Sequence, residues 1–356
     1  MKESWRLFKD VSVPVSTAEG LAVDDSLPLS VTEHDSPPVL HLYTFVPSVI
    51  IGKYQDIEAA LRLERCMARG IEYNRRSTGG GTVIMGPEIV ALGLGIGINH
   101  PCLNGGTVGG IFQSLGRVLC RALERFHIKA RFRPKNDLEV EGRKIAGLSA
   151  ASEKGRGLLF HTSLLVDFDI PLMLDIMNTP LIKVQDKGYN CFSQRMTTVR
   201  RETGRDIQVW EVMDSIQGSF ERELDIGLKD SEPDEWEREN IDRLIVNRYR
   251  NRDWIFSHKH PRSRMGIGRL KTGAGLLEVY LSLSGGSIEN VIITGDFFAA
   301  EEDLGRLESA LRWASAREES IREKVIREWR KDMIYGLEPE SLIRAIMMAK
   351  ENQVRL

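Results

Sequence analysis

The sequence predicts an α+β protein of two domains, one over residues 1–250 and a smaller one over residues 251–356. Three observations lead to this prediction. Runs rich in β-branched and aromatic residues alternate with amphipathic helical patterns through the first domain. The pattern changes at Trp254, after which two alternating strands are followed by helices. A chain of 356 residues is also long enough to bury two hydrophobic cores.

Composition and charge limit the classes of function. Hydrophobic residues make up 42% and charged residues 28% of the chain, as in ordinary soluble proteins. The formal net charge of -2 gives no general attraction to nucleic acid or to an anionic membrane, so we expect neither as a partner. The four cysteines are widely spaced and form no CxxC pair, which favours a reducing compartment. The N-terminus lacks the apolar core of a signal peptide, so we expect a cytoplasmic protein.

The first elements are a helix, two strands and a second helix. Residues 16–31 predict a helix that directs Leu21 and Leu27 inward and Asp24 and Asp25 outward. The β-branched and aromatic runs at residues 38–45 and 48–53 predict strands, and residues 56–68 predict the second helix.

A glycine-rich loop follows the next strand. Gly79, Gly80 and Gly81 carry no Cβ atoms, so the backbone can approach a ligand closely and present N–H groups to it. The adjacent Arg75 and Arg76 can neutralise a phosphate or carboxylate group. The segment matches neither a Walker A loop nor a GxGxxG motif. The alternative is a glycine bulge in a twisted sheet.

Residues 134–150 predict a β-hairpin with a turn at Glu141-Gly142. The side-chain period of two places Lys144, Ala146 and Leu148 on one face of the return strand. Asn136 and Asp137 precede the first strand, where they can face the same pocket as the lysine. An amide, a carboxylate and a lysine together suit a phosphate ester and its metal ion. The alternative is an ordinary hairpin with an exposed lysine.

Further elements complete the first domain. Residues 157–166 predict a strand in which His161 interrupts an apolar run, and a structural role in the core is the simpler interpretation of this histidine. A polar loop at residues 183–203 contains Cys191 and Arg195, and the acidic segment 229–240 predicts a linker. Helices are expected at residues 108–127, 171–178 and 207–224.

The second domain combines strands and helices. Residues 266–283 and 287–294 predict strands joined by a Gly285-Gly286 turn. A helix lined by leucines, from Leu304 to Leu311, and two later helices complete it, at residues 318–330 and 339–351. We expect no chemistry from this domain alone.

Three motifs in a fixed order resemble a known family. They are RRSTGGGTV at residues 75–83, KNDLEVEGRKIAGLSA at residues 135–150 and FHTSLLV at residues 160–166. Together they resemble the lipoate–protein ligase family, in a superfamily that also holds biotin protein ligases and octanoyltransferases. Beyond Trp254, GGSIENVIITGDFF and DMIYGLEPESLIRAI resemble the accessory domain of ligases that activate free lipoate. The resemblance implies a mixed β-sheet catalytic domain of the biotin/lipoate ligase type, packed by helices on one face, with a small α+β C-terminal domain.

The resemblance also implies roles for individual residues. Lys144 is similar to the catalytic lysine that contacts the carboxyl group and α-phosphate of lipoyl-AMP. Substrate binding is implied for Arg75, Arg76, Gly79, Gly80, Gly81, Val83 and His161. Nucleotide binding is implied for Asn136, Asp137, Lys144, Ala146, Gly147 and Arg195. Asp137 is also expected to hold Mg²⁺.

The reaction implied by the resemblance is that of an ATP-dependent lipoate–protein ligase. Lipoate attacks the α-phosphate of ATP, and the ε-amine of a carrier lysine then attacks the resulting lipoyl-AMP. The expected cofactors are ATP and Mg²⁺, with lipoate as substrate. The expected partners are lipoyl-accepting carrier domains, such as glycine cleavage H-like proteins and the E2 domains of 2-oxoacid dehydrogenases.

Two other functions stay open. Octanoyltransferases of the same superfamily use a cysteine nucleophile and no ATP, and Cys191 lies in a loop that can reach the pocket. The first alternative is therefore an ATP-independent octanoyl or lipoyl transferase using Cys191, although no neighbouring histidine in the sequence lowers the pKa of this thiol. The second is a non-catalytic module that binds lipoylated proteins, against which the presence of Lys144 and Asp137 argues.

Overall fold

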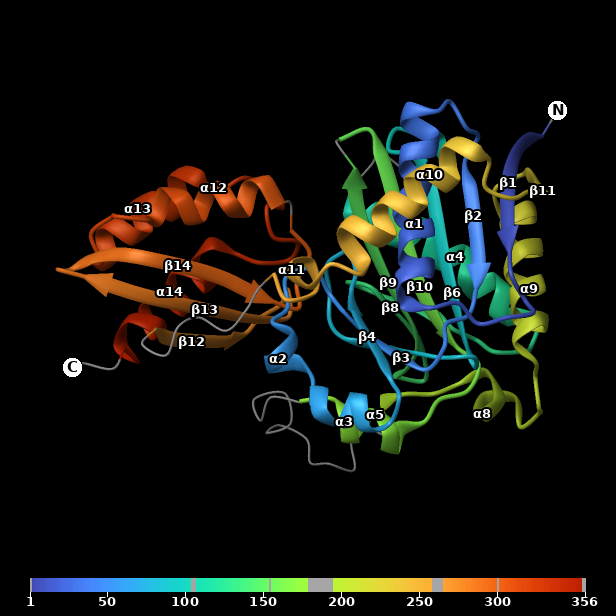
Figure 1. Cartoon of the computed structure of the whole chain (residues 1–356), viewed down its shortest axis with the longest axis horizontal. Coiled ribbons are helices and arrows are strands. Elements are labelled where there is room, and N and C mark those ends of the chain that lie inside the picture. The colour runs from blue at the N-terminus through green and yellow to red at the C-terminus, as the bar shows by residue number, and fades with distance from the viewer. Residues whose placement is uncertain are drawn as a thin grey trace. The chain divides into compact units, whose positions relative to one another are not determined.

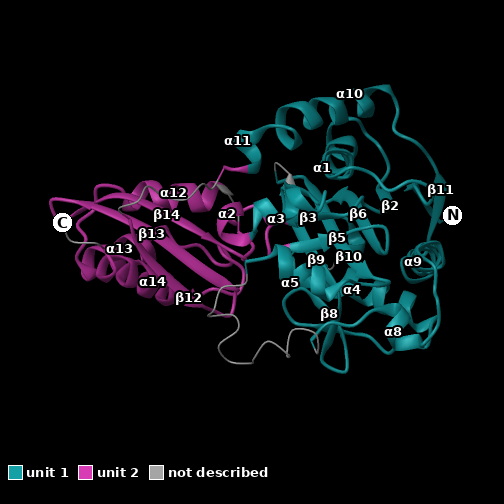
Figure 2. Cartoon of the chain, turned by 60° about the horizontal axis from the view of Figure 1, so that its bottom comes forward, with its two compact units in different colours: residues 1–50, 61–78, 83–255 teal, residues 51–60, 79–82, 256–356 magenta. Residues whose placement is uncertain are grey.

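The structure is a computed structural model that describes residues 2–103, 107–153, 155–178, 195–257, 265–299 and 301–353. The chain divides into two compact units (Figure 2). Unit 1 comprises residues 1–50, 61–78 and 83–255, and unit 2 comprises residues 51–60, 79–82 and 256–356. The functional division into a catalytic domain at residues 1–250 and an accessory domain at residues 251–356 stays a prediction.

An eight-stranded mixed sheet forms the centre of unit 1 (Figure 1). Its order is β11-β1-β2-β6-β10-β9-β8-β7. β1 runs parallel to both β11 and β2, whereas the remaining neighbours are antiparallel. The strands are β1 (Glu3–Lys9), β2 (Val39–Tyr43), β6 (Ile89–Gly97), β7 (Arg131–Arg133), β8 (Asp137–Val140), β9 (Arg143–Glu153), β10 (Gly157–Leu165) and β11 (Ile226–Asp230). The predicted α+β class with a mixed sheet is confirmed.

Helices cover both faces of this sheet. Helix α1 packs on β6, where Gly95 leaves room for the backbone of Leu27. Helix α4 packs on the opposite face, where its Gly116 lies against the side chains of Leu138 and Leu148. The expectation of helices on one face only is therefore wrong, and the continuous apolar run of β6 is typical of a strand covered on both sides.

Among the described residues of unit 1, the helices are short except for three of 15 to 17 residues, α1, α4 and α9. They are α1 (Thr17–Glu33), α3 (Leu63–Ala68), α4 (Val108–Glu124), α5 (Ile170–Ile176), α8 (Val199–Thr203), α9 (Val209–Glu223), α10 (Glu235–Leu244) and α11 (Arg252–Ile255), with a 3-10 turn η1 (Pro101–Leu103) and a π-helix η2 (Ile245–Tyr249). A small sheet of order β4-β3-β5 completes this part, from β3 (Ser48–Ile51), β4 (Glu72–Arg75) and β5 (Val83–Met85).

The helix predicted at residues 16–31 is present as α1, but the burial of its side chains differs in part from the prediction. Leu21 and Leu27 are buried as expected. Asp24 and Asp25, expected to face solvent, are only 1% and 6% exposed. The reason is that α1 lies between the sheet and the segment formed by α10 and η2, so it has no solvated side at this level.

Two other expectations are wrong. Residues 56–68 do not form one helix, because the helical conformation ends after α2 (Ile57–Ala60) and begins again in α3. The acidic segment 229–240 is not a linker, because its first residues end β11 and the remainder begins α10. Asp234 and Glu237 form a capping box at the start of that helix, and Glu237 also pairs with Arg6 at 2.6 Å.

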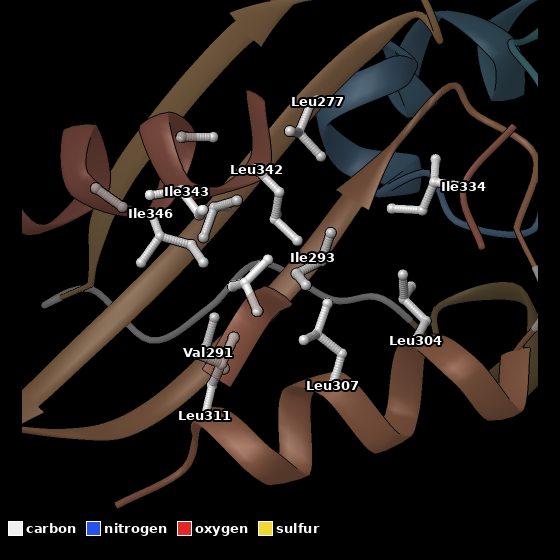
Figure 3. Close-up of a cluster of buried hydrophobic side chains, with 14 of the residues drawn as sticks. Leu277, Val291, Ile293, Leu304, Leu307, Leu311, Ile334, Leu342, Ile343 and Ile346 are labelled. Atoms are coloured by element: carbon white, nitrogen blue, oxygen red, sulfur yellow. The ribbon is translucent and has the colours of Figure 1, made fainter. Parts of the chain in front are cut away.

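Unit 2 has its own core around a three-stranded antiparallel sheet of order β12-β13-β14. Its apolar side chains meet those of α12 and α14 (Figure 3). Leu277 and Ile293 of the sheet face Leu307 of α12 and Leu342 of α14 in this cluster. The elements are β12 (Gly266–Lys271), β13 (Leu276–Ser284), β14 (Ser287–Gly295), α12 (Glu301–Leu311), α13 (Glu318–Glu328) and α14 (Pro339–Glu351).

Among the described residues, none of the helices is long and apolar enough to cross a lipid bilayer. The cytoplasmic localisation stays a prediction.

Candidate functional site

The hairpin of β8 and β9 is present where the sequence predicts it. Glu141 and Gly142 form its turn with φ angles of 49° and 79°. Positive φ at both central residues is the requirement of a type I′ turn, which matches the right-handed twist of the flanking strands. The turn therefore sets how β9, the strand that carries Lys144, pairs with β8.

A β-bulge directly after this turn changes the face on which Lys144 lies. Ala146 pairs with Leu138, but Lys144 pairs with Glu139, so Ile145 has no partner across the hairpin. The prediction that Lys144, Ala146 and Leu148 share a face is wrong, because the inserted residue breaks the period of two. Ala146 and Leu148 are both buried.

The ammonium group of Lys144 lies over Gly147 and beside Asp137. Nζ is 2.7 Å from Asp137 Oδ1, and both side chains are about 30% exposed. A Cβ atom on Gly147 would lie 2.9 Å from Nζ and 3.8 Å from Ser163 Oγ. A half-buried cation is therefore held above a floor of small residues, on the face of the sheet that carries α1.

The segment after the undescribed residues 179–194 is joined to this lysine. The Thr197 N–H donates to the carbonyl oxygen of Lys144 at 2.8 Å, and Met196 forms a β-bridge with Lys144. Glu202 of α8 accepts from Arg143 at 3.0 Å and also from the Thr197 hydroxyl. Met196 and Thr197, which follow the undescribed residues 179–194, therefore lie directly beside Lys144.

Asn136 has a structural role at the end of the hairpin. Its Nδ2 donates to the carbonyl oxygen of Leu148 at 2.8 Å, and its own carbonyl oxygen accepts from Leu148 N–H at 2.7 Å. Asp137, the expected Mg²⁺ ligand, pairs with Lys144. Within the described residues no group of three or more His, Cys, Asp and Glu side chains is placed to hold a metal ion. Asp137 as a Mg²⁺ ligand stays a prediction.

The two arginines before the glycine loop are both buried. Arg75 is fully buried, and its guanidinium donates to the carbonyl oxygens of Trp254 and Ile255 at 3.0 to 3.1 Å. Arg76 donates from Nε to Thr78 Oγ1 at 3.1 Å. Burial lowers the pKa of Arg76 to about 10. Val83 of β5 packs at the edge of the apolar cluster under α1.

The glycine segment belongs to unit 2 and packs against its backbone. The Gly80 N–H donates to the carbonyl oxygen of Phe297 at 3.0 Å, and Gly80 has a φ of 93° that favours glycine. A Cβ on Gly79 would lie 2.5 Å from the same oxygen. Backbone packing is thus sufficient to explain these two glycines, and their role in substrate binding stays a prediction.

We expect Gly79→Ala to lower the free energy of unfolding by about 1–3 kcal/mol, because the Phe297 backbone must move to admit the methyl group. Gly81→Ala is the matched control, since its Cβ would lie 3.7 Å from Asp296 Cβ, an ordinary contact. Thermal unfolding of both variants measures the difference. Equal midpoints would show that the Phe297 contact does not require glycine.

His161 takes part in a buried cluster that the sequence did not reveal. Its Nε2 lies 2.8 Å from Asp24 Oδ2, and its Nδ1 lies 3.5 Å from Thr78 Oγ1. Asp24 Oδ1 meets His41 Nδ1 at 2.7 Å, and Tyr43 donates its hydroxyl to Oδ2 at 2.8 Å. Asp24 and His41 were not among the predicted site residues. The adjacent carboxylates within an otherwise apolar helix were the signal that could have identified Asp24.

Two candidates remain, Arg195 and Cys191. Arg195 is exposed, and Cys191 lies outside the described residues. The other three cysteines have weakly acidic thiols. Burial raises the pKa of Cys66, and it raises those of Cys102 and Cys120 to about 12 and about 11. None of these three described thiols is therefore appreciably ionised at neutral pH.

Comparison with known proteins supports the resemblance seen in the motifs. The family model "Lipoyl protein ligase A/B catalytic domain" matches residues 16–221, and "Bacterial lipoate protein ligase C-terminus" matches residues 268–346. The resemblance to the lipoate–protein ligase family is confirmed.

Curated relatives include both transferases and a ligase. The octanoyltransferases LipM of Brevibacillus brevis and Carboxydothermus hydrogenoformans are 27% and 25% identical to the chain. Each alignment covers 71% of this chain and 98% or 99% of the relative. The lipoate-protein ligase LplJ of Bacillus subtilis is 25% identical, with 78% of this chain and 82% of the relative covered.

Solved structures support the fold. LipL1 of P. falciparum in complex with lipoate aligns with a TM-score of 0.73 at 16% identity, over 97% of this chain and 99% of that chain. The bipartite lipoate protein ligase of Thermoplasma acidophilum aligns with a TM-score of 0.64 at 23% identity, over 74% of this chain and 100% of that chain.

The expected ATP-dependent ligase function is wrong, because four relatives that are 25–27% identical to the chain, each matched over 98–99% of its length, are named octanoyltransferases. A lysine on a hairpin does not distinguish the two reactions, since a cation can stabilise the charge on the phosphate oxygens in adenylation as well as the oxyanion in thioester transfer. Asn136, Asp137, Ala146, Gly147 and Arg195 remain candidate site residues without an assigned nucleotide. With more than half of its residues matched by one family model, the chain belongs to the lipoyl protein ligase A/B catalytic domain family.

Proposed function

We propose that the chain is an ATP-independent acyl transferase that moves an octanoyl or lipoyl group from a thioester donor to a lysine of a carrier protein. The observation that carries this proposal is the similarity to octanoyltransferases over 71% of the chain, with almost the whole length of those relatives covered. The half-buried ammonium of Lys144 supports it, because a fixed cation stabilises an oxyanion at the reacting carbonyl group.

The proposed reaction has two thioester steps. The thiolate of Cys191 attacks the donor thioester carbonyl, an acyl-enzyme thioester forms, and the donor thiolate leaves with a proton from solvent. The ε-amine of the acceptor lysine then attacks the acyl-enzyme carbonyl, an amide bond forms and the C–S bond to Cys191 breaks, and the proton lost from the amine nitrogen goes to the departing sulfur. Lys144 stabilises the oxyanion in both steps and is not itself acylated.

Cys191 is proposed as the nucleophile on two grounds. The three cysteines of the described segments have thiols with raised pKa values, so they supply little thiolate. Cys191 precedes Met196 by only five residues, and Met196 forms a bridge with Lys144.

The proposed acceptors are lipoyl-accepting carrier domains, such as H-like proteins and E2 domains. The T. acidophilum ligase is described together with its E2 lipoyl domain, which is a carrier of this kind.

The small side chains around Lys144 are proposed to face the acyl chain, together with the apolar cluster that includes Val83. Residues 251–356 are proposed to be an accessory domain.

A transfer assay without ATP tests the proposal. We expect the wild-type protein to move octanoate from an octanoyl-carrier protein to a lipoyl-accepting domain, detected as a mass increase of the acceptor. A hydroxylamine-sensitive acyl-enzyme should accumulate when the acceptor is left out. Cys191→Ser should abolish both signals, while Cys120→Ser, which changes a thiol of raised pKa, should keep them.

Two results would contradict the proposal. One is acceptor modification that requires ATP and free lipoate. The other is full transfer by Cys191→Ser, which would remove the thioester from the pathway.

A further inference from the structure

The segment from Arg125 to Lys135 carries a concentration of positive charge that the proposed reaction does not use. It contains five arginine and lysine residues and no acidic residue, so its formal net charge is +5. The whole chain has a formal net charge of -2, so the remaining residues together carry -7. All five basic side chains are exposed: Arg125, Lys129, Arg131, Arg133 and Lys135. We call these five residues the basic edge.

The basic edge lies at one side of the large sheet. Strand β7, which carries Arg131 and Arg133, is the last strand in the sheet order. Arg125 follows the last residue of α4, and Lys129 lies in the connection between α4 and β7. Lys135 lies in the turn between β7 and β8. The five residues therefore follow the chain along the border of the sheet.

The register of the strands puts Arg133 in line with the Lys144 ammonium. Arg133 pairs with Asp137 of β8, and Asp137 pairs with Gly147 of β9, over which the ammonium lies. Side chains directly opposite in an antiparallel sheet share a face, whereas Phe132 faces α4 on the other side. Because neighbouring strands are about 4.8 Å apart, β7 lies about 10 Å from the strand that carries Lys144.

The surface between the basic edge and Lys144 is open to solvent. The side chain of Arg133 is 62% exposed, and those of Asp137 and Lys144 are 28% and 30% exposed. Helix α1, which packs on this face of the sheet, lies over β6 and β10. Exposure therefore rises from the site to the border of the sheet, so a partner seated on the basic edge can also reach Lys144.

Most of the charge on the basic edge is not neutralised by the chain itself. Arg133 pairs with Glu139 of β8. The other four side chains form no ion pair within the described part of the chain. Like charges that lie close together repel one another, and an acidic surface brought against them removes that repulsion. The basic edge is thus complementary to an acidic partner.

A folded acidic protein fits this surface better than a nucleic acid does. The edge is bordered by Glu139 and Glu141 of the hairpin, and the rest of the chain is acidic, so a long polyanion would be repelled beyond the edge. Sites for single-stranded nucleic acid also offer aromatic side chains on which bases stack. The aromatic residues between the basic ones do not, because Phe126 is buried and Phe132 is half-buried.

Resting on the proposed transferase function, we propose that the basic edge is the docking surface for an acidic face of the acceptor carrier domain. The positive charge attracts the carrier to the border of the sheet, from which its lysine reaches the open face at Lys144. The charges act on the encounter of the two proteins, so they raise the association rate and leave the chemical steps unchanged.

The association rate of an E2 lipoyl domain tests this proposal. The acceptor lysine of that domain is replaced with glutamine, so that binding is measured without acyl transfer. We expect Arg131→Glu and Arg125→Glu each to lower kon about tenfold at about 50 mM salt, with a smaller change in koff. The difference should disappear at about 1 M salt, where the Debye length is about 3 Å. Arg131→Lys, which keeps the charge, should keep the wild-type rate.

Lys229→Glu is the matched control, because it reverses an exposed charge on β11, the opposite edge strand of the same sheet. Charge on an edge strand also prevents pairing with other chains, and that role applies to both edges. We expect kon of the control to stay within about twofold of the wild type. Equal losses in Lys229→Glu and Arg131→Glu would overturn the proposal, as would an unchanged kon in both arginine variants.

Two further measurements identify the partner. Amidation of the surface carboxylates of the E2 domain should lower kon of the wild type and abolish the additional effect of Arg131→Glu. An undiminished effect would show that the basic edge does not meet acidic groups. Binding of a DNA duplex that is tighter than binding of the E2 domain, and is lost in Arg131→Glu, would assign the edge to nucleic acid and overturn the proposal.

Acyl transfer to hydroxylamine separates this inference from the proposed function. Hydroxylamine is a small acceptor without a surface to dock, so Arg131→Glu should use it at the wild-type rate. A loss of that transfer in Arg131→Glu would overturn the proposal, because it would show damage to the site itself. Absence of acyl transfer to either acceptor by the wild type would instead reject the transferase function, whereas the association rates would still decide whether the edge binds the carrier.

Discussion

Lys144→Ala should lower acyl transfer by about 10²–10³-fold, the usual loss on removing one oxyanion-stabilising group. The Lys144 ammonium lies 2.7 Å from Asp137 Oδ1 and is only partly exposed. Water that fills its place in Lys144→Ala carries no positive charge. Lys144→Arg should not restore the rate. A planar guanidinium is larger than an ammonium and would not fit the space between Asp137 and Gly147 in the same geometry.

Gly147→Ala provides a second variant that displaces the charge without removing it. The new Cβ would lie 2.9 Å from Nζ, and the flexible end of Lys144 can move away at little cost in stability. We expect a loss of transfer with an almost unchanged unfolding midpoint, measured by the ATP-free transfer assay and by thermal unfolding. Gly227→Ala in β11, where a Cβ meets no atom within 4 Å, is the control. Full activity in Lys144→Ala would remove this residue from the mechanism.

The hairpin shows what the sequence could and could not predict. The alternating residues and the Glu141-Gly142 turn identified both strands, because those signals are local. The bulge at Ile145 was not predictable from a period of two, since its cause lies in how β8 pairs with β9. The sequence therefore identified Lys144 as a candidate but placed it on the wrong face.

The buried carboxylates of α1 show the same limit over a longer range. An acidic residue on a helix is usually solvated, and this general rule predicted that Asp24 and Asp25 face outward. Their partners come from residues 17 to 224 positions away along the chain, such as His41 and Tyr249. The adjacency of the two carboxylates is a local signal, but no local pattern indicates their partners, so the network itself became interpretable only from the structure.

The function was mistaken for a different reason. The motifs around Lys144 and the glycine loop identified the family correctly. These motifs do not indicate whether the acyl group is activated by ATP or delivered as a thioester. Either reaction needs a cation that stabilises developing negative charge, and a surface that binds the acyl chain. Cys191 is the proposed nucleophile of the thioester route, but no neighbouring histidine in the sequence marks it as one.

Gly93→Ala should cause a large loss of stability in unit 1. Its methyl group would overlap Asp24 Oδ1 and lie 2.5 Å from Asp24 Cγ, in a position that the carboxylate occupies to reach His41 and His161. Either α1 moves away from β6 or the carboxylate leaves its donors, and both changes expose or unpair buried groups. We expect the free energy of unfolding to fall by about 3 kcal/mol.

Gly97→Ala in the same strand is the matched control, because a Cβ there meets no atom within 4 Å. Replacing a strand glycine with alanine in open space should be neutral or stabilising by up to about 1 kcal/mol, since the unfolded chain loses entropy. Urea unfolding of both variants gives the comparison, and the double variant Asp24→Ala/Gly93→Ala tests its cause. Removal of the carboxylate makes room for the methyl group, so the loss in the double variant should be smaller than the sum of the two single losses. Additive losses would show that the contact between Gly93 and Asp24 does not set the cost.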